Sequence, residues 1–375
     1  MGSRVLIAMS GGVDSSTTAL LMRQAGYDCV GATMRLLPTG CGTGDAKVAR
    51  TVANQLDIPF HEIDLRDTFR DRVIEPFIEG YERGETPNPC IDCNRALKFG
   101  ALFDLATRLG CDTVATGHYA QVTHDDTTDR WQLRTATDLD KDQSYALYTL
   151  RQEQLARLHL PLGALPSKTE VRRLATAAGL PNADKPDSQN ICFVPDGDYA
   201  RFIEHYRGHT YPEGDMLDAS GQVVGRHKGL IHYTLGQRKG LGPHGRPVYV
   251  SAIDPSANTI TITAADEAAN ETANETPNEA ANETANENSA LHATTCYLRN
   301  LNWIALPHTP EAPLRCGVKI GYKHSICPAR IEKAGECVQV TFDHPQRAIT
   351  PGQAAVLYEG DTVLGGGTIT TSGKS

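Results

Sequence analysis

The 375-residue sequence has no uninterrupted apolar run of about 18 residues, the length that a membrane-spanning helix needs. Its N-terminus also lacks the basic and apolar regions of a secretory signal peptide. Hydrophobic residues make up 40% of the chain and charged residues 22%, as in a soluble globular protein. We therefore expect a cytoplasmic protein without a membrane-bound part. A chain of this length exceeds one ordinary core, so two or three domains are expected.

Positive charge is missing from one stretch, residues 265–290, which holds seven acidic residues and no basic one. This stretch accounts for most of the net charge of −9, and the rest of the chain is nearly neutral. The global charge thus argues neither for nor against nucleic-acid binding. An Asn-Glu pair recurs every four residues from 270 to 287 and leaves no apolar face. We predict a disordered insert at 265–290.

A glycine-rich loop near the N-terminus has no lysine. The apolar run 4–8 predicts a strand, 17–23 predicts a helix, and Met9–Ser16 lies between them. Glycines that allow close backbone approach, followed by a helix start, form an anion cradle. A triphosphate loop of the GxxxxGK[ST] type would carry a lysine. The string SGGVDSS instead resembles the pyrophosphate (PP) loop of ATP pyrophosphatases, which implies adenylation by ATP. A capped glycine turn without a ligand is the alternative.

Strand-like and helix-like segments alternate over the first half of the chain. Strands are predicted at 27–34, 59–65 and 112–120, helices at 45–56, 73–81, 97–109 and 151–179, and a hairpin turn at 125–128. This alternation predicts a doubly wound parallel sheet with ligands at the carboxyl ends of its strands. After residue 207, short strands punctuated by glycine predict two small β-barrel-like domains. The predicted domains are 1–165, 166–206, 207–264, the insert 265–290, and 291–375.

Cys90 and Cys93 form a single Cys-x-x-Cys pair among ten cysteines, and the second pair that a structural zinc site would require is absent. Cys93 precedes a predicted helix capped by Asn94, with Lys98 nearby, and both features would lower the pKa of a thiol. We therefore predict redox or nucleophilic chemistry at Cys93. Cys192 lies in an irregular loop, 181–195, where it could be reactive or inert.

Two further polar groups fall near the predicted sheet edge. His118 lies near the end of the strand predicted at 112–120 and could contact a nucleotide or serve structure alone. Lys141 begins a predicted helix, a position that is unfavourable for a cation unless an anionic partner lies nearby.

The order of seven motifs is similar to that in bacterial tRNA-specific 2-thiouridylases. They are SGGVDSS, NPCxxCN, TGHYA, KDQSY, the Cys192 loop DSQNICF, TLGQRKGL and TPGQAAVLY. The resemblance covers nearly the whole chain except 265–290. It implies ATP-dependent 2-thiolation of the wobble uridine in the anticodons of lysine, glutamate and glutamine tRNAs. The partners implied are the tRNA anticodon loop and a sulfur-relay or cysteine desulfurase donor, and Mg²⁺ is expected to accompany ATP.

The resemblance also implies roles for individual residues. Cys192 resembles the persulfide carrier, and Cys93 resembles the second catalytic thiol, which can close a disulfide with Cys192. The ATP site would comprise Ala8, Met9, Ser10, Gly11, Gly12, Val13, Asp14, Ser15, Met34 and Gly117. The tRNA contacts would comprise Asn88, Pro89, Cys90, His118, Lys141, Asp142, Gln143, Tyr322 and Gln353.

The sequence departs from the family pattern at two places. Some members have an aspartate at the position of Cys90, so no acid–base role is carried over to it. The expected Arg-Tyr pair reads Gly321-Tyr322, and Lys319 or Lys323 could compensate. Three alternatives stay open: a [4Fe-4S] cluster held by Cys90, Cys93 and Cys192, a PP-loop synthetase acting on a small acid, and a non-catalytic RNA-binding protein.

Overall fold

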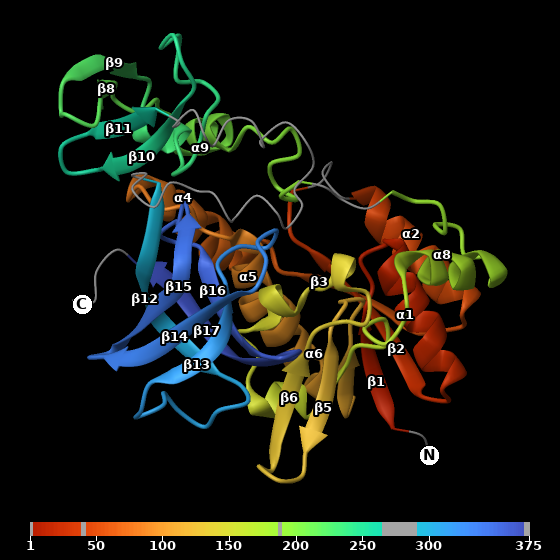
Figure 1. Ribbon diagram of the computed structural model, residues 1–375. Coiled ribbons are helices and arrows are strands. Elements are labelled where there is room, and N and C mark those ends of the chain that lie inside the picture. Colours follow the sequence, from red (N-terminus) through yellow and green to blue (C-terminus); the bar gives the residue numbers. More distant parts are fainter. Residues whose placement is uncertain (1–2, 39–42, 187–189, 265–290, 371–375) are drawn as a thin grey trace.

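The computed structural model describes residues 3–38, 43–186, 190–264 and 291–370, and the structural statements below refer to these residues. The predicted insert 265–290 lies outside them. The first half of the chain forms a parallel sheet of five described strands in the order β3-β2-β1-β4-β7 (Figure 1). Its strands are β1 (Arg4–Ala8), β2 (Asp28–Arg35), β3 (Phe60–Asp64), β4 (Thr113–Ala115) and β7 (Leu158–His159).

Helices cover both faces of this sheet. They are α1 (Val13–Gln24), α2 (Thr43–Gln55), α3 (Arg66–Phe69), the π-helical η1 (Arg70–Ile74), α4 (Glu75–Glu82), α5 (Pro89–Cys93), the π-helical η2 (Asn94–Ala101), α6 (Leu102–Arg108), the 3₁₀ turns η3 (Leu139–Lys141) and η4 (Ser144–Leu147), α7 (Gln152–Leu155) and α8 (Lys168–Ala177). Successive side chains of a strand point to opposite faces. In β1, Val5 and Ile7 accordingly pack in the same cluster as Leu20 of α1, whereas Leu6 packs in that of Leu102 of α6. The doubly wound sheet predicted from the sequence is confirmed.

Two predicted elements are wrong. The helix expected over 151–179 is divided into α7, the short strand β7 and α8, because Pro161 and Pro166 remove backbone donors inside it. The strand expected over 112–120 ends at Ala115, since the chain then leaves the sheet and turns toward α1.

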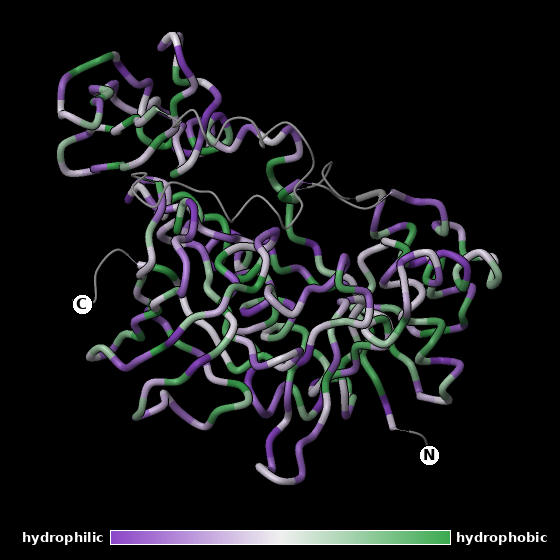
Figure 2. The backbone as a smooth tube through the Cα atoms, in the orientation of Figure 1, coloured by the Kyte–Doolittle hydropathy of each residue, from purple (hydrophilic) through white to green (hydrophobic). Residues whose placement is uncertain are grey.

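The C-terminal part forms a closed antiparallel barrel in the order β12-β15-β14-β13-β16-β17, which the pairing of β12 with β17 completes. Its strands are β12 (His292–Trp303), β13 (Leu314–Lys319), β14 (Cys327–Ala334), β15 (Cys337–Arg347), β16 (Ala354–Glu359) and β17 (Thr362–Thr370). The predicted hairpin is present as β5 (Gln121–Asp125) and β6 (Arg130–Arg134), and its hydrophilic tip is visible in Figure 2. Because β6 also pairs with β17, the hairpin joins the first half of the chain to the barrel.

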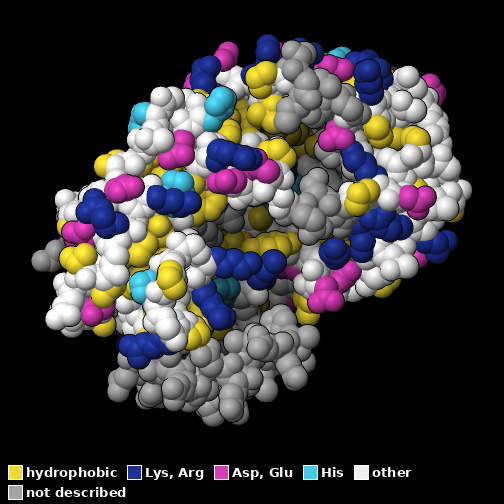
Figure 3. Space-filling view, turned by 90° about the horizontal axis from the view of Figure 1, so that it is seen from above, with side chains coloured by type: hydrophobic (Ala, Val, Ile, Leu, Met, Phe, Trp, Pro, Cys, Tyr) yellow, Lys and Arg dark blue, Asp and Glu magenta, His cyan; other side chains and the backbone are white. Residues whose placement is uncertain are grey.

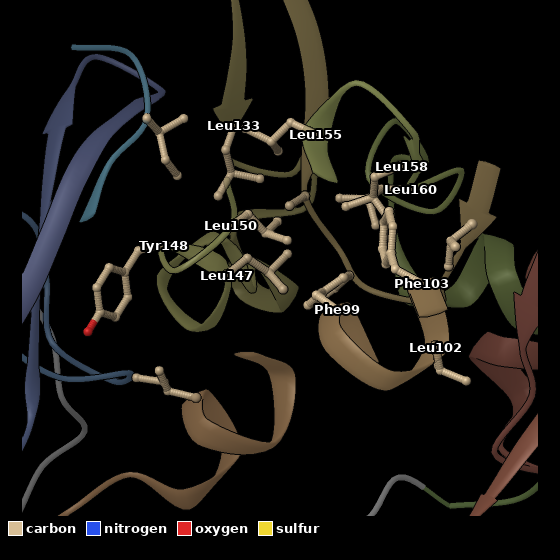
Figure 4. Packing of buried hydrophobic residues seen from close by; sticks show 14 of the residues in the cluster. Phe99, Leu102, Phe103, Leu133, Leu147, Tyr148, Leu150, Leu155, Leu158 and Leu160 are labelled. Atoms are coloured by element: carbon tan, nitrogen blue, oxygen red, sulfur yellow. The ribbon is translucent and has the colours of Figure 1, made fainter. Parts of the chain in front are cut away.

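One hydrophobic cluster is shared between the parallel-sheet unit and the barrel. Figure 4 shows Phe99 of η2, Leu133 of β6 and Leu147 of η4 among its members, and Val356 and Tyr358 of the barrel belong to the same cluster. A shared core of this kind fixes the barrel beside α5 and η2. Any site formed near α5 can therefore draw on residues from the barrel.

The remaining part is a small sheet in the order β10-β11-β8-β9, which Figure 1 shows above α4. Its elements are α9 (Tyr199–Arg207), β8 (Gly214–Leu217), β9 (Val223–His227), the 3₁₀ turn η5 (Leu230–His232), β10 (Val248–Asp254) and β11 (Thr259–Ala264). The predicted fold class, a parallel α/β sheet followed by two small β units, is thus confirmed. None of the described helices is both long enough and apolar enough to cross a bilayer.

Candidate active site

The loop after β1 has the geometry of an anion cradle. Gly11 adopts a φ of +79°, and a Cβ there would lie 2.2 Å from the carbonyl oxygen of Asp45, so only glycine fits. Gly12 is the N-cap of α1 and supplies no side-chain acceptor to the first-turn amides. Those amides and the positive end of the helix dipole are thus available to an anion.

Gly117 brings a second segment against this loop. It follows β4, and a Cβ at this position would lie 2.9 Å from both the carbonyl carbon of Asp14 and the amide nitrogen of Ser15. Because β1 lies between β2 and β4, the chain reverses its direction of sheet growth at β1 and β4. Ligands of doubly wound sheets bind at such a switch point. The predicted ATP-site residues 8–15 and Gly117 therefore meet, and Met34 lies near the carboxyl end of the neighbouring β2.

Four polar side chains that the sequence did not single out contact the loop. The Asp14 carboxylate accepts hydrogen bonds from Tyr119 Oη at 2.6 Å and from Lys168 Nζ at 2.6 and 2.7 Å. Asn182 Nδ2 donates to the Gly11 carbonyl oxygen at 3.0 Å, and Lys185 Nζ lies 3.4 Å from that oxygen. These contacts join residues that are 105 to 174 positions apart, so no local sequence pattern contains them. The one local feature at this segment is the N-cap of α8, where the Ser167 hydroxyl accepts from the Glu170 amide.

The Cys-x-x-Cys segment is helical earlier than predicted. Helix α5 begins at Pro89, with Asn88 as its N-cap accepting from the Cys90 amide at 3.2 Å. Cys93 lies at the end of α5 and continues directly into η2, so it is not at a helix N-terminus. Asn94 is not an N-cap, because it follows α5 directly and its buried side chain donates to the Ala146 carbonyl at 2.9 Å. The prediction of a dipole-stabilised Cys93 thiolate is therefore wrong.

Burial dominates the ionisation of both predicted catalytic thiols. Cys93 is 9% exposed, and burial raises the pKa of its thiol against the opposing charge of Lys98. Cys192 lies at the surface, but the protein atoms around its sulfur, followed by Cys93 and Cys90, raise its pKa to about 11. Both sulfurs are therefore mainly protonated thiols at neutral pH.

The Cys192 loop is anchored beside Cys93. Phe193 packs edge-on against Phe69 at 5.6 Å and Phe77 at 5.3 Å, and all three rings share a hydrophobic cluster with Cys93. Cys93 contributes to the raised pKa of the Cys192 thiol. Nine cysteines of the described part are free thiols, so the Cys93–Cys192 disulfide stays a prediction.

The predicted cluster ligands do not form a metal-binding set. Within the described residues, no group of three or more His, Cys, Asp or Glu side chains is placed to hold a metal ion. Cys90, Cys93 and Cys192 therefore do not fit a [4Fe-4S] cluster in this arrangement.

Lys98 links the thiols to the loop. Its Nζ lies 3.5 Å from Nε2 of His118, whose Nδ1 lies 2.8 Å from Thr116 Oγ1. Burial, followed by the charge of Lys98, holds the pKa of His118 well below its usual value, so its imidazole is neutral. His118 is next to Gly117, and Lys98 lowers the pKa of both Cys93 and Cys192. The Lys98–His118 pair is thus close to both the loop and the thiols.

The predicted tRNA contacts divide into accessible and structural residues. Tyr322 is 46% exposed, and Lys319 Nζ lies 5.8 Å from the centre of its ring; compensation by Lys319 or Lys323 stays a prediction. Asp142 is 7% exposed and accepts hydrogen bonds from the amides of Ala136 and Ser144 and from the Ser144 hydroxyl.

Two other predicted contacts, Gln143 and Gln353, hold backbone in place. Gln143 Oε1 accepts from the Tyr119 amide at 3.0 Å. Gln353 Nε2 donates to the Thr86 carbonyl at 2.8 Å, so the barrel holds the segment that leads to α5. Lys141, at the end of η3, is half-buried. Contact of these residues with tRNA stays a prediction.

Comparison with known proteins gives full-length matches. The chain is 42% identical to the tRNA-specific 2-thiouridylase MnmA of Clostridioides difficile, over 99% of each chain. It is 44% identical to that of Moorella thermoacetica, over 97% of this chain and 98% of the relative. The chain belongs to the tRNA-specific 2-thiouridylase family. The family models described as tRNA methyl transferase HUP domain, tRNA methyl transferase PRC-barrel domain and aminomethyltransferase beta-barrel domain match residues 3–196, 200–264 and 293–369.

A more distant likeness is to the U34-tRNA thiolase NcsA from Methanococcus maripaludis, solved with its [4Fe-4S] cluster. The identity is 17% and the TM-score 0.35, with 54% of this chain and 66% of that chain covered. A likeness at this level carries no argument about a cofactor of the present chain.

Proposed function

We propose that this protein is a cytoplasmic tRNA-uridine 2-sulfurtransferase that converts the wobble uridine of lysine, glutamate and glutamine tRNAs to 2-thiouridine. The observation that carries the proposal is its membership, over its full length, of the 2-thiouridylase family. The presence of a PP loop and of two thiols that both lie within the influence of Lys98 supports it, because thiolation requires both an activated carbonyl and a sulfur nucleophile.

The first step is adenylation. Oxygen 2 of the uracil attacks the α-phosphorus of ATP, the bond from that phosphorus to the bridging oxygen breaks, and pyrophosphate leaves as the uracil N3 proton is lost. The loop amides and α1 bind the phosphates. Mg²⁺ is held in many nucleotide sites by one or two carboxylates together with phosphates and water, and Asp14 supplies such a carboxylate. When bound there, Mg²⁺ would neutralise part of the negative charge of the phosphates.

The second step is sulfur transfer. A persulfide on Cys192, loaded by a sulfur-relay or cysteine desulfurase partner, attacks carbon 2 through its terminal sulfur, and AMP leaves with the former oxygen 2. The Cys93 thiolate then attacks the Cys192 sulfur, which closes a Cys93–Cys192 disulfide and releases 2-thiouridine. A thiol reductant restores the two thiols. No step requires an iron–sulfur cluster.

The surface near the site suits a nucleic acid. Figure 3 shows Lys and Arg side chains around a hollow on the face seen from above, with acidic side chains between them. The exposed ring of Tyr322 with Lys319 beside it is a stacking surface of the type that binds splayed-out RNA bases. A wobble base in an anticodon loop is unpaired and can leave the stack at low cost.

The test is reconstitution with ATP, unmodified tRNA and a persulfide donor, followed by mass spectrometry of the nucleosides. We expect 2-thiouridine at the wobble position with the wild type and none with Cys93→Ser or Cys192→Ser, while both variants retain ATP binding. Cys111→Ser, at a buried cysteine in another cluster, is the matched control and should keep thiolation. Turnover of a small acid without tRNA, or thiolation by either serine variant, would overturn the assignment. Full activity of a preparation free of iron would rule out the cluster mechanism.

A further inference from the structure

The side chains of the PP loop supply no positive charge that could balance a bound triphosphate. No Lys or Arg occurs between Ala8 and Met22, while the triphosphate of ATP carries several negative charges. The dipole of α1 supplies the equivalent of only about half a positive charge. Asp14, in the first turn of α1, adds negative charge of its own. Cations from elsewhere in the chain are therefore needed when phosphates are bound.

Two lysines from the segment 168–185 lie at the loop. Lys168, the first residue of α8, has its Nζ 2.6 and 2.7 Å from the two carboxylate oxygens of Asp14, and its side chain is only 12% exposed. Lys185 Nζ forms an ion pair with Asp45 and lies 3.4 Å from the Gly11 carbonyl oxygen. Both ammonium groups therefore lie close to the loop backbone that would bind phosphate: Lys168 contacts the side chain of Asp14, and Lys185 lies near the Gly11 carbonyl oxygen.

The fold holds this segment against the loop independently of the lysines. Asn182, which is 5% exposed, donates from Nδ2 to the Gly11 carbonyl at 3.0 Å and to Ser16 Oγ at 2.9 Å. Helix α8 packs against α1, and Val171 and Leu180 belong to the same cluster as Val13. The two ammonium groups therefore stay at the loop when their present ion pairs open.

We propose that Lys168 and Lys185 are the cationic ligands of the β- and γ-phosphates of ATP and of the pyrophosphate product, and that Asp14 and Asp45 hold them in place while the loop is empty. The inference rests on the proposed adenylation and names the groups that bind its leaving group. The two lysines take the part that a lysine inside the loop plays in GxxxxGK[ST] proteins. A flexible ammonium can exchange one carboxylate for a phosphate oxygen without a change of fold.

The experiment compares binding of ATP, inorganic pyrophosphate and AMP by calorimetry to full-length wild type, Lys168→Met and Lys185→Met. Loss of a charge-assisted hydrogen bond corresponds to about 10- to 100-fold in affinity. We expect that loss for ATP and pyrophosphate in each variant, with AMP affinity unchanged, because AMP lacks the β- and γ-phosphates. Arginine substitution at the same positions should recover part of the affinity. Arg173→Met is the matched control, since Arg173 pairs with Glu170 on the exposed side of α8.

A double-mutant cycle separates direct contact from the effect of an unpaired carboxylate. If Lys185 binds phosphate, Lys185→Met should weaken ATP binding at least as much in the Asp45→Asn background as in the wild-type background, because Asp45 no longer competes for the ammonium. Recovery of wild-type affinity in the double variant would mean that unpaired Asp45 caused the loss, and would overturn the proposal for Lys185. Equal losses for AMP and ATP, or unchanged pyrophosphate affinity, would overturn it for the lysine concerned. A wild type that binds no ATP would instead refute the proposed function.

Discussion

Gly117→Ala tests the geometry of the nucleotide site with a single methyl group. The Cβ would lie 2.9 Å from two backbone atoms of the Asp14–Ser15 peptide, whereas ordinary contacts begin near 3.4 Å. Since neither partner is a flexible side chain, the loop and the segment after β4 must separate by about half an ångström. Overpacking of this kind costs about 1–3 kcal/mol. If that cost falls on the nucleotide-bound state, the KM for ATP rises by about 5- to 150-fold.

The assay measures tRNA-dependent ATP–pyrophosphate exchange and the KM for ATP. Gly225→Ala is the control, because Gly225 has a negative φ and its added Cβ would meet only Met216, at an ordinary distance of 3.7 Å. Alkylation of Cys192 should be unaffected in both variants, which distinguishes a local defect from unfolding. A Gly117→Ala protein with wild-type KM and exchange rate would refute the placement of the nucleotide between β1 and β4.

Two further outcomes follow from burial. Because the pKa of Cys192 is about 11 rather than 9.0, its thiolate is about 100-fold scarcer at pH 7, partly offset by higher nucleophilicity, so iodoacetamide should alkylate it about tenfold more slowly than a free thiol. Peptide mass spectrometry should show the rate still rising between pH 9 and 10, and a plateau below pH 9 would contradict the raised pKa. Asp142→Ala leaves three buried donors without their acceptor and should destabilise the fold by about 2–4 kcal/mol, seen as a lower Tm, whereas exposed Asp140→Ala should not.

The sequence predicted the architecture well where the signal is local. Alternation of apolar segments identified β1, β2 and β3, and the Asp-Asp-Thr-Thr turn identified the β5–β6 hairpin. The helix predicted over 151–179 failed because its apolar spacing is interrupted by Pro161 and Pro166, whose effect on the backbone outweighs that spacing. The pairing of β6 with β17 joins residues more than 200 positions apart, and no local pattern contains it.

The site shows the same division. Gly11 and Gly12 could be assigned from a short string, since a loop after a strand constrains its own backbone. The Cys93 environment could not, because burial in a cluster with Phe69, Phe77 and Phe193 reverses the expected direction of its pKa. Lys168 likewise reads as an ordinary residue after a helix cap, and its contact with Asp14 exists only once α8 packs on α1.

Burial of the thiols has two opposing consequences for the proposed reaction. An adenylated base is open to hydrolysis, so a site that excludes water protects it. The same exclusion raises the pKa of Cys93, the protein atoms around the sulfur of the surface residue Cys192 raise the pKa of that thiol, and the thiolate becomes scarce at both. Lys98 acts against this second effect at both thiols, and its contact is with a neutral His118 rather than a carboxylate that would offset its charge. A buried site that must hold a sulfur anion needs a cation beside it, and Lys98 supplies that cation to both thiols.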